Sequence, residues 1–352
     1  MRSILQFLGL MLLLSGCKST HLVTVYSLEP APVELSKNIK RIGIINEVQT
    51  TANKEQIESL EAFVAATDHQ WSKEGKEAAI EGLLVELSKD KRFDTILILK
   101  STSENWKQKS TAEIEIPWKS LEELCVANNL DAIFSLAFYK TDTRVTNKKS
   151  SMEELDLLRV KNMVDAREIT LETLIENGWR IYDPFEKKVL DEIRINEEIV
   201  IQAKGENAMN ALRSMTDRSD SMLLKSKGSG SAFGMRLKPY SKAIQREIYT
   251  NGSEKLSQAK DAIQEENWLE AARLWQLETT NEKAKIKAMA CHNMAVLYEI
   301  KNDLPKAMEW AILAQSYFKD KNNTAYLEAL KQRSVQNGLA EEQLENIVYL
   351  NK

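Results

Sequence analysis

Residues 41–46 read RIGIIN, and this short β-branched run bounded by polar side chains decides how the first half of the chain folds. β-Branched residues favour a buried strand. On its C-terminal side, residues 73–89 carry apolar side chains with a period near 3.6, which predicts a helix. A strand at 94–99 (DTILIL), a helix at 121–128 and a strand at 131–139 follow. This β-α-β-α-β order predicts a sheet with helices packed on it.

The next part of the chain changes to antiparallel strand signals. Residues 169–175 and 178–182 predict two strands with a short break between them, and residues 189–195 predict a third strand after the Asp183-Pro184 turn. Residues 142–166 are charged and weakly patterned, so we expect a mobile insertion there. A helix is expected from 208 to about 226, interrupted near Gly228 and Gly230.

Residues 228–234 (GSGSAFG) carry glycines at intervals like those of a dinucleotide-binding loop. The segment follows a helix instead of a strand, and no Lys-Ser or Lys-Thr pair comes after it. Neither phosphate-binding fingerprint is therefore met. We expect a flexible loop at this position.

The C-terminal third is continuously helical and rich in alanine from 254 to 333. Residues 266–268 (ENW) with Ala271 align with residues 302–304 (NDL) with Ala307, and 307 minus 271 is 36. Small residues at this period resemble tetratricopeptide repeats, in which they let paired helices approach closely. Two copies and one further helix make a short solenoid, which we expect to dock on the first domain.

The N-terminus resembles the export signal of a bacterial lipoprotein. Arg2 precedes an apolar run at 4–14, which is too short to span a bilayer, and residues 14–17 read LSGC. Resemblance to the lipobox implies a diacylglycerol on Cys17 and cleavage after Gly16; a plain secretory signal is the alternative. Lys18 replaces the Asp that retains many lipoproteins at the inner membrane. We therefore expect an outer-membrane lipoprotein that faces the periplasm.

The expected class is α+β: a mixed α/β sheet domain with late antiparallel strands, then an all-α repeat domain. The expected division is a signal peptide at 1–16, a lipidated tether at 17–37, a mixed α/β domain at 38–248 and tetratricopeptide-like repeats at 249–352. Pro30 and Pro32 predict irregular backbone in the tether.

The chain resembles an uncharacterised family of cell-envelope lipoproteins from Bacteroidota, through residues 28–33 (LEPAPV), 39–46 (IKRIGIIN), 178–184 (GWRIYDP) and 290–314. That resemblance implies an envelope lipoprotein with a repeat tail and no known activity. The arrangement of the first domain also resembles the periplasmic N-terminal module of TolB and modules of lipoprotein activators of peptidoglycan synthases. Such modules dock proteins, although a fold does not fix a function.

Composition and motifs favour no catalytic chemistry. The 48 basic and 52 acidic residues are interspersed, which argues against nucleic acid as a partner. His21, His69 and His292 have no zinc-ligand spacing, so neither metal nor cofactor is expected. Paired carboxylates such as those at 122–123 and 197–198 are frequent enough to arise by chance, and no nucleophile motif stands out. Cys125 and Cys291 are expected to be buried thiols; an interdomain disulfide is the alternative.

For binding, the repeat segment nominates two residues. Asn293 occupies a position that often faces the groove of tetratricopeptide proteins, and Tyr298 follows on the same helix. Other repeat aromatics are expected in the core: Trp268, Trp275 and Trp310. The leading hypothesis is therefore a non-catalytic docking or scaffold lipoprotein, held to the membrane by the lipid on Cys17 and bound to an envelope protein. The alternatives are a hydrolase of cell wall or glycan with an acidic site, and a structural component of an assembly complex.

Overall fold

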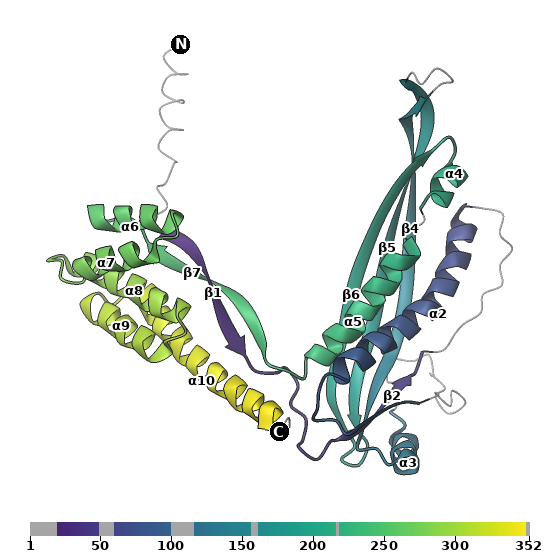
Figure 1. Ribbon diagram of the computed structural model, residues 1–352, viewed down its shortest axis with the longest axis horizontal. Coiled ribbons are helices and arrows are strands. Elements are labelled where there is room, and N and C mark those ends of the chain that lie inside the picture. The colour runs from purple at the N-terminus through teal and green to yellow at the C-terminus, as the bar shows by residue number, and fades with distance from the viewer. Residues whose placement is uncertain (1–19, 49–59, 100–115, 156–160, 216–217, 350–352) are drawn as a thin grey trace. The chain divides into compact units, whose positions relative to one another are not determined.

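The computed structural model describes residues 20–48, 60–99, 116–155, 161–215 and 218–349, which fall into two compact units. We call Pro32–Lys238 with the last few residues the sheet unit. The segment that ends at Ala31, together with Pro239–Glu345, is the helical unit. Sheet and helices come first and an all-helical region follows (Figure 1), which confirms the predicted fold class.

The sheet unit contains five strands in the order β3-β2-β4-β5-β6. Strand β2 is parallel to both of its neighbours, and β4, β5 and β6 run antiparallel in sequence order. The strands are β2 (Arg41–Asn46), β3 (Thr95–Ile98), β4 (Ala132–Leu155), β5 (Lys161–Asp183) and β6 (Lys188–Gly205). The parallel part follows from β-α-β connections and the antiparallel part from direct hairpins.

Helices cover both faces of this sheet. Helices α2 (Leu60–Leu87) and α5 (Arg218–Met235) lie along the long strands, and their core includes Trp179 and Phe233, whose stacked rings are 5.1 Å apart. Helix α3 (Trp118–Asn128) covers the other face, and the short α4 (Ala208–Arg213) packs further along β5 and β6. The predicted helices at 73–89 and 121–128 are thus present, the first with additional N-terminal turns.

The glycine-rich segment is helical, and the expectation of a flexible loop was wrong. A Cβ on Gly230 would collide with the backbone carbonyl of Ala79, and one on Gly82 with that of Lys227. Glycines therefore let α2 and α5 touch backbone to backbone. Ser231 Oγ also donates to Gly82 O at 3.1 Å. Local preference favours a loop, but tertiary packing selects the helix.

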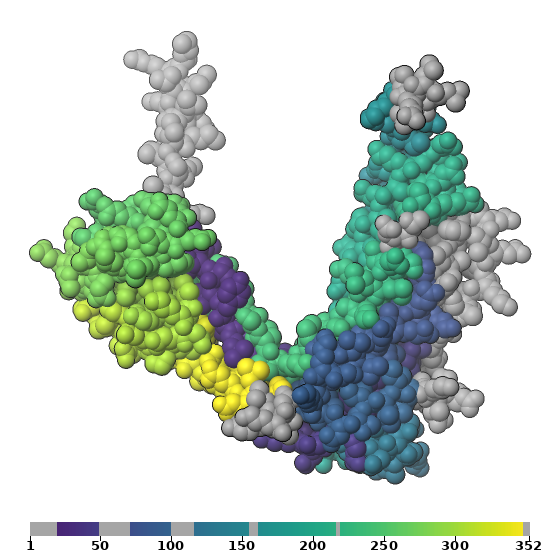
Figure 2. Space-filling model, in the orientation of Figure 1, coloured from purple at the N-terminus to yellow at the C-terminus, as the bar shows by residue number. Residues whose placement is uncertain are grey.

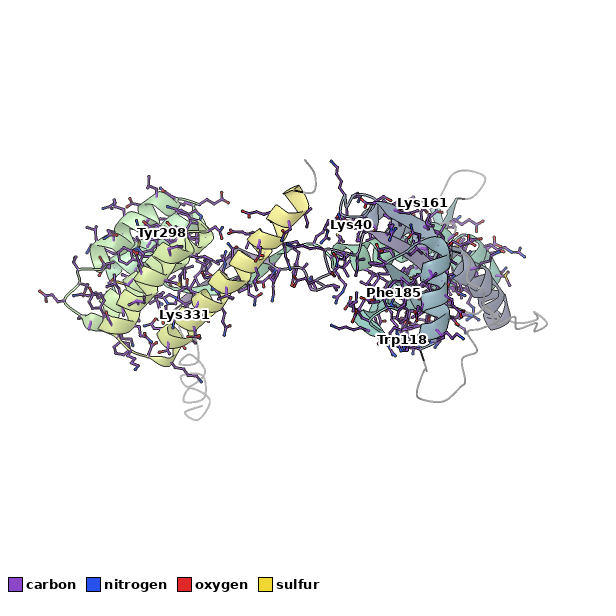
Figure 3. The ribbon with its side chains drawn as sticks, turned by 90° about the horizontal axis from the view of Figure 1, so that it is seen from below. Lys40, Trp118, Lys161, Phe185, Tyr298 and Lys331 are labelled. Atoms are coloured by element: carbon purple, nitrogen blue, oxygen red, sulfur yellow. The ribbon has the colours of Figure 1, made fainter. Side chains whose placement is uncertain are left out.

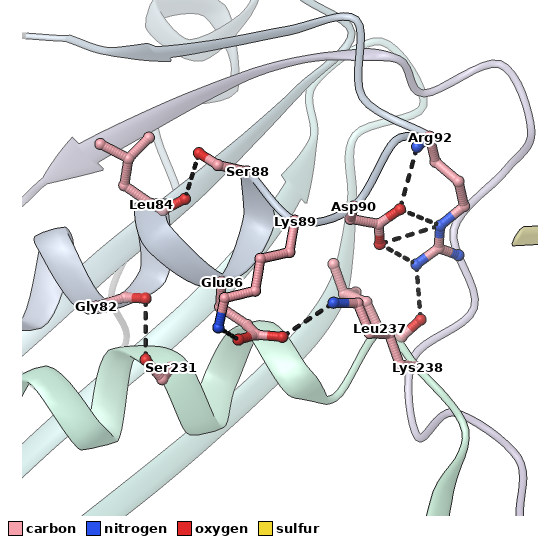
Figure 4. A network of polar contacts seen from close by, with 10 residues as sticks. All are labelled: Gly82, Leu84, Glu86, Ser88, Lys89, Asp90, Arg92, Ser231, Leu237 and Lys238. Atoms are coloured by element: carbon pink, nitrogen blue, oxygen red, sulfur yellow. Dashed lines mark hydrogen bonds and ion pairs between the residues drawn. The ribbon is translucent and has the colours of Figure 1, made fainter. Parts of the chain in front are cut away.

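Polar contacts fasten the ends of these two helices (Figure 4). Glu86 accepts from Lys89 at 2.8 Å and from Lys238 at 2.9 Å. Asp90 holds the guanidinium of Arg92, which donates to Leu237 O at 2.8 Å. Residues about 150 positions apart in sequence are thereby joined at one end of the helix pair.

Two further expectations are corrected in the long hairpin of β4 and β5. Residues 142–166 do not form a mobile insertion: their described parts belong to β4 and β5, paired from Ile133↔Tyr182 to Leu155↔Lys161. No break occurs at 176–177, because β5 is continuous there. Asn177 is fully buried inside the strand; its Oδ1 accepts from Trp179 Nε1 at 2.7 Å, whereas its Nδ2 has no hydrogen-bond partner among the described residues.

The helical unit begins with strand β1 (Thr20–Glu29), which pairs antiparallel with β7 (Tyr240–Tyr249). Residues 20–29 are therefore not the irregular tether that we expected. Five helices follow: α6 (Glu254–Gln264), α7 (Trp268–Glu278), α8 (Ala284–Ile300), α9 (Leu304–Tyr317) and α10 (Lys321–Tyr349). Val23 of β1 and Ile248 of β7 are buried in the same core as the helices. This shared core, together with the pairing to β7, holds β1 against a part of the chain that is distant in sequence.

Candidate functional site

Asn293 lies inside the helical unit, where its side chain hydrogen-bonds to the backbone of strand β7. Its Oδ1 accepts from Tyr249 N at 2.8 Å and its Nδ2 donates to Tyr249 O at 2.7 Å. The residue is fully buried. A side-chain amide thus satisfies both backbone groups of one strand residue, as a neighbouring strand would. We expected Asn293 to face an open groove, but its amide is occupied by an extended segment of the same chain.

Tyr298, the second nominated residue, is half-buried on α8 (Figure 3). The Nζ atoms of Lys301 and Lys306 lie 5.6 Å and 5.0 Å from its ring centroid. Two lysine ammonium groups therefore lie against the Tyr298 ring at the C-terminal end of α8. Asn293 contacts strand β7, whereas Tyr298 contacts two lysines, and the two residues share no partner among the described contacts.

A buried ionic network next to Asn293 was not predicted. Glu299 of α8 is fully buried and forms ion pairs at 2.9 Å with Arg246 of β7 and with Arg333 of α10. Tyr326 donates to its second oxygen at 2.9 Å. Burial raises the pKa of Glu299, but hydrogen bonds and charges from these partners outweigh it, so the pKa lies below its usual value. The carboxylate stays ionised and joins three elements.

His292 belongs to the same interior and is buried. Its Nε2 lies 2.9 Å from Glu247 O, and its ring packs against Tyr249 and Tyr326, with centroids 5.0 Å and 4.6 Å away. Burial lowers the pKa of His292, so the imidazole is neutral at ordinary pH. Among the described residues, no group of three His, Cys, Asp or Glu could hold a metal ion.

A second polar cluster lies in the sheet unit, at the carboxyl end of β2. Glu47 follows that strand directly, and its Oε1 accepts a hydrogen bond from the buried Ser135 of β4. Burial raises the pKa of Glu47, against the opposing effects of hydrogen bonds from Ser135 and Tyr182 and the charge of Arg180. Arg180 in turn donates to Glu192 at 2.8 Å. The carboxyl ends of parallel strands are where open α/β sheets bind ligands.

A raised pKa is one of the properties that a general acid needs. A carboxyl group whose pKa is raised keeps its proton to higher pH and can donate it. Tyr182, whose pKa burial also raises, is held on its other side by Trp118, which meets it edge-on with ring centroids 6.0 Å apart (Figure 3 labels Trp118). Sequence reasoning missed Glu47, although its place directly after a buried strand was the available signal.

The two remaining cysteines are buried and free, as predicted. Burial raises the pKa of Cys125 to about 12 and that of Cys291 to about 11. Both thiols are therefore protonated and poor nucleophiles. The predicted signal segment and Cys17 lie outside the described residues, as does the side chain of His69. Across the described helices, no segment is long and apolar enough to cross a bilayer.

Among solved structures, a Helicobacter pylori protein assigned as a homologue of the neuraminyllactose-binding hemagglutinin is 14% identical, with a TM-score of 0.24; the match covers 58% of this chain and 94% of that one. A hypothetical protein of Chlamydia trachomatis is 14% identical with a TM-score of 0.20, over 55% of this chain and 99% of that one. Scores this low carry no argument about fold or function. No curated protein matches the chain in sequence.

Two family models match. Residues 257–332, within α6 to α10, match the domain of unknown function DUF6340. Residues 39–249, which include the whole described sheet and strand β7, match the domain of unknown function DUF8603. Because the second match covers more than half of the sequence, this chain belongs to the DUF8603 family.

Proposed function

We propose that this protein is a membrane-anchored envelope lipoprotein that docks another envelope protein without catalysis. A lipid on Cys17 holds it to the membrane. Two or three acyl chains on one residue anchor stably, whereas a single chain binds only marginally. The residue after the cysteine, Lys18, favours the outer membrane with the chain facing the periplasm.

The observation that carries the docking role is an internal repeat in the helical unit. Glu266 and Asn302 both have φ 59° and are 36 positions apart (302 minus 266). Each is followed by a helix-capping residue: Asn267 accepts from Glu270 N, and Asp303 from Lys306 N, both at 3.1 Å. The same turn thus occurs twice at an offset close to the tetratricopeptide period of about 34 residues. We assign the helices to that class, whose members bind proteins.

Helix α8, the first helix of the pair α8–α9, already binds an extended segment, because its Asn293 bonds to the backbone of β7. We therefore place the partner on the solvent face of the β1–β7 ribbon. Alternate residues of a strand share a face. Leu22 is 57% and Tyr26 68% exposed, and β1 is visible at the surface in the space-filling view (Figure 2, purple). Large apolar side chains exposed together on one strand suit a protein contact.

Photo-crosslinking in cells tests this proposal. A photoreactive residue in place of Tyr26 is expected to give a reproducible protein adduct in membranes, and the yield is expected to fall in a Cys17→Ala background. The matched control is the same residue in place of Leu269, which is 84% exposed on α7. No adduct specific to position 26 would contradict docking on this face. Metabolic labelling with a fatty-acid probe tests the anchor separately.

The Glu47 cluster favours a second candidate, a hydrolase of cell wall or glycan. Its basis is a carboxyl group with a raised pKa beside Ser135 and Tyr182. The purified lipidated protein would then release soluble fragments from peptidoglycan, and Glu47→Gln would abolish the release. Release that is equal in both proteins would exclude Glu47 as the acid.

A further inference from the structure

We infer that a basic and aromatic patch on the helical unit rests on the headgroups of an anionic phospholipid bilayer. The membrane-facing patch consists of Lys285 and Lys287 of α8, Tyr317 of α9, and Phe318 and Lys319 just after it. This inference rests on the proposed anchor at Cys17 and specifies how the anchored chain is oriented.

The patch lies at the end of the ribbon from which the anchor departs. Thr20, the first residue of β1, pairs with Tyr249, the last of β7. The Tyr249 side chain hydrogen-bonds to Asn322 and interacts electrostatically with Asp320. Asp320 immediately follows Lys319 of the patch. Just beyond Tyr249, a Cβ on Gly252 would lie 2.8 Å from Ile286 Cδ1, in the first turn of α8. Both halves of the patch therefore border this end of the ribbon.

The length of the chain brings the lipid to the same place. Cys17 is three residues before Thr20, and a residue spans at most about 3.5 Å, so the acylated residue is within about 10 Å of Thr20. Because the ribbon is antiparallel, the chain before Thr20 leaves at the end where β7 finishes. An anchor this short gives the unit little freedom to turn another surface to the bilayer.

The side chains of the patch suit an interface. Lys287 Nζ lies 4.9 Å from the Tyr317 centroid and Lys285 Nζ lies 6.0 Å from that of Phe318. Both rings are 39% exposed. Tyrosine and phenylalanine rings at the level of the headgroups, with lysines reaching the phosphates, are typical of proteins that lie on membranes.

Charge favours an anionic surface in particular. Within residues 282–287 and 317–321 there are five lysines and two acidic residues, Glu282 and Asp320. Asp320 Oδ1 accepts from Asn323 N at 2.7 Å, so this carboxylate caps the start of α10. Juxtamembrane lysines are attracted to anionic lipids over about a Debye length.

The same helix offers a matched control. At the other end of α8, Tyr298 is flanked by Lys301 and Lys306 at similar distances from its ring. This second cluster has the same chemistry but lies at the end of α8 away from Ile286 and Gly252. A general affinity of lysine and tyrosine for lipid would affect both clusters, whereas an oriented unit would protect only the first.

Cysteine labelling of the full lipidated chain in vesicles tests the inference. Cys125 and Cys291 are buried, so a water-soluble maleimide reports an introduced thiol. We expect Ser316→Cys, beside the patch, to react several-fold more slowly in phosphatidylethanolamine vesicles containing phosphatidylglycerol than in detergent. Lys301→Cys should react equally in both. Adding Lys285→Glu, Lys287→Glu and Lys319→Glu to Ser316→Cys should restore the rate, but adding Lys306→Glu should not.

The possible failures are distinguishable. Equal reaction of Ser316→Cys in vesicles and detergent, with the acyl chain present on Cys17 by mass spectrometry, overturns the membrane-facing patch and leaves the anchor intact. Slow reaction of Lys301→Cys as well overturns the orientation in favour of a general affinity for lipid. Absence of acyl chains on Cys17 overturns the proposed anchor and this inference with it.

Discussion

The two units solve the same problem, joining segments that are distant in sequence, with different chemistry. In the sheet unit, α2 and α5 meet through glycines, and the rings of Trp179 and Phe233 fill the space above the sheet. In the helical unit, β7, α8 and α10 meet at the buried carboxylate of Glu299. Close backbone contact is central to the first, with ion pairs at the ends of the helices, and a buried carboxylate is central to the second, so the two should respond to different substitutions.

Two partly or fully buried glutamates make the difference plain. Burial raises the pKa of both Glu47 and Glu299. Glu299 has two arginines and a tyrosine donating to it, and its pKa ends below the usual value. Glu47 receives hydroxyl hydrogen bonds and a more distant arginine charge, and its pKa ends above it. The number of cations in direct contact therefore decides the sign.

The largest expected effect comes from Glu299→Ala. This change leaves Arg333, only 5% exposed, and Arg246 without their carboxylate, which typically costs about 3–5 kcal/mol. We expect hydrogen exchange to accelerate in the helical unit while the sheet unit keeps its protection. Glu270→Ala is the control, because it removes an exposed carboxylate paired with Arg273 and should change neither unit. Equal acceleration in both units would break the comparison.

Gly230→Ala should destabilise the sheet unit in turn. The new Cβ would collide with the Ala79 carbonyl, and overpacking of this kind costs about 1–3 kcal/mol. Gly228→Ala, two residues away on the exposed side of α5, meets nothing within 4 Å and should stabilise the helix by about 0.5–1 kcal/mol. Denaturant unfolding followed by exchange in α2 and α5 measures both. The same sign for the two variants would show that α2 and α5 are not in close contact.

Asn293→Leu is expected to have a moderate effect confined to the ribbon. It leaves the partly buried Tyr249 N–H and C=O without the amide that they bond, at a cost of about 1–3 kcal/mol. Amide exchange at Tyr249 and along β1 should accelerate more than exchange within α6 and α7. Uniform acceleration across the helical unit would mean that Asn293 supports the whole core and not the ribbon alone.

The smallest expected effect is a pH response of opposite sign in the two units. For Glu299 the folded-state pKa is depressed, so its stabilisation is present above the usual value of 4.5 and is lost as the pH falls below it. For Glu47 the folded-state pKa is raised, so the sheet unit gains stability as the pH falls through that pKa toward 4.5.

Exchange protection measured from neutral pH downward checks this response. The sheet unit should become better protected first, and the helical unit should lose protection only in more acidic solution. Glu47→Gln should remove the gain in the sheet unit and leave the helical unit unchanged. A gain that persists in Glu47→Gln would assign it to another group.

Much of the fold followed from local pattern. Strand β2 has the limits predicted from its β-branched run, and the helices of the C-terminal third follow from their periodicity. Glu266 and Asn302, which share a φ of 59°, lie 36 positions apart (302 minus 266). Within the candidate site, Asn293 and Tyr298 could be nominated from their positions in the sequence. The groups that contact the Asn293 amide and the Tyr298 ring could not be predicted. Glu299 was missed because nothing near it in sequence indicates which cations approach, and Glu47 was missed although its place directly after a buried strand was a signal.

The sequence by itself determined the class of many segments, such as β2 and the C-terminal helices, since propensity and periodicity act over neighbouring residues. Only the tertiary structure decided that Thr20 pairs with Tyr249, that the glycine-rich segment is a helix and that Asn293 holds a strand of its own chain. Each of these depends on groups that are far apart in sequence and are buried together. Their free energy comes from packing, hydrogen bonding and charge pairing between them, which no local pattern records.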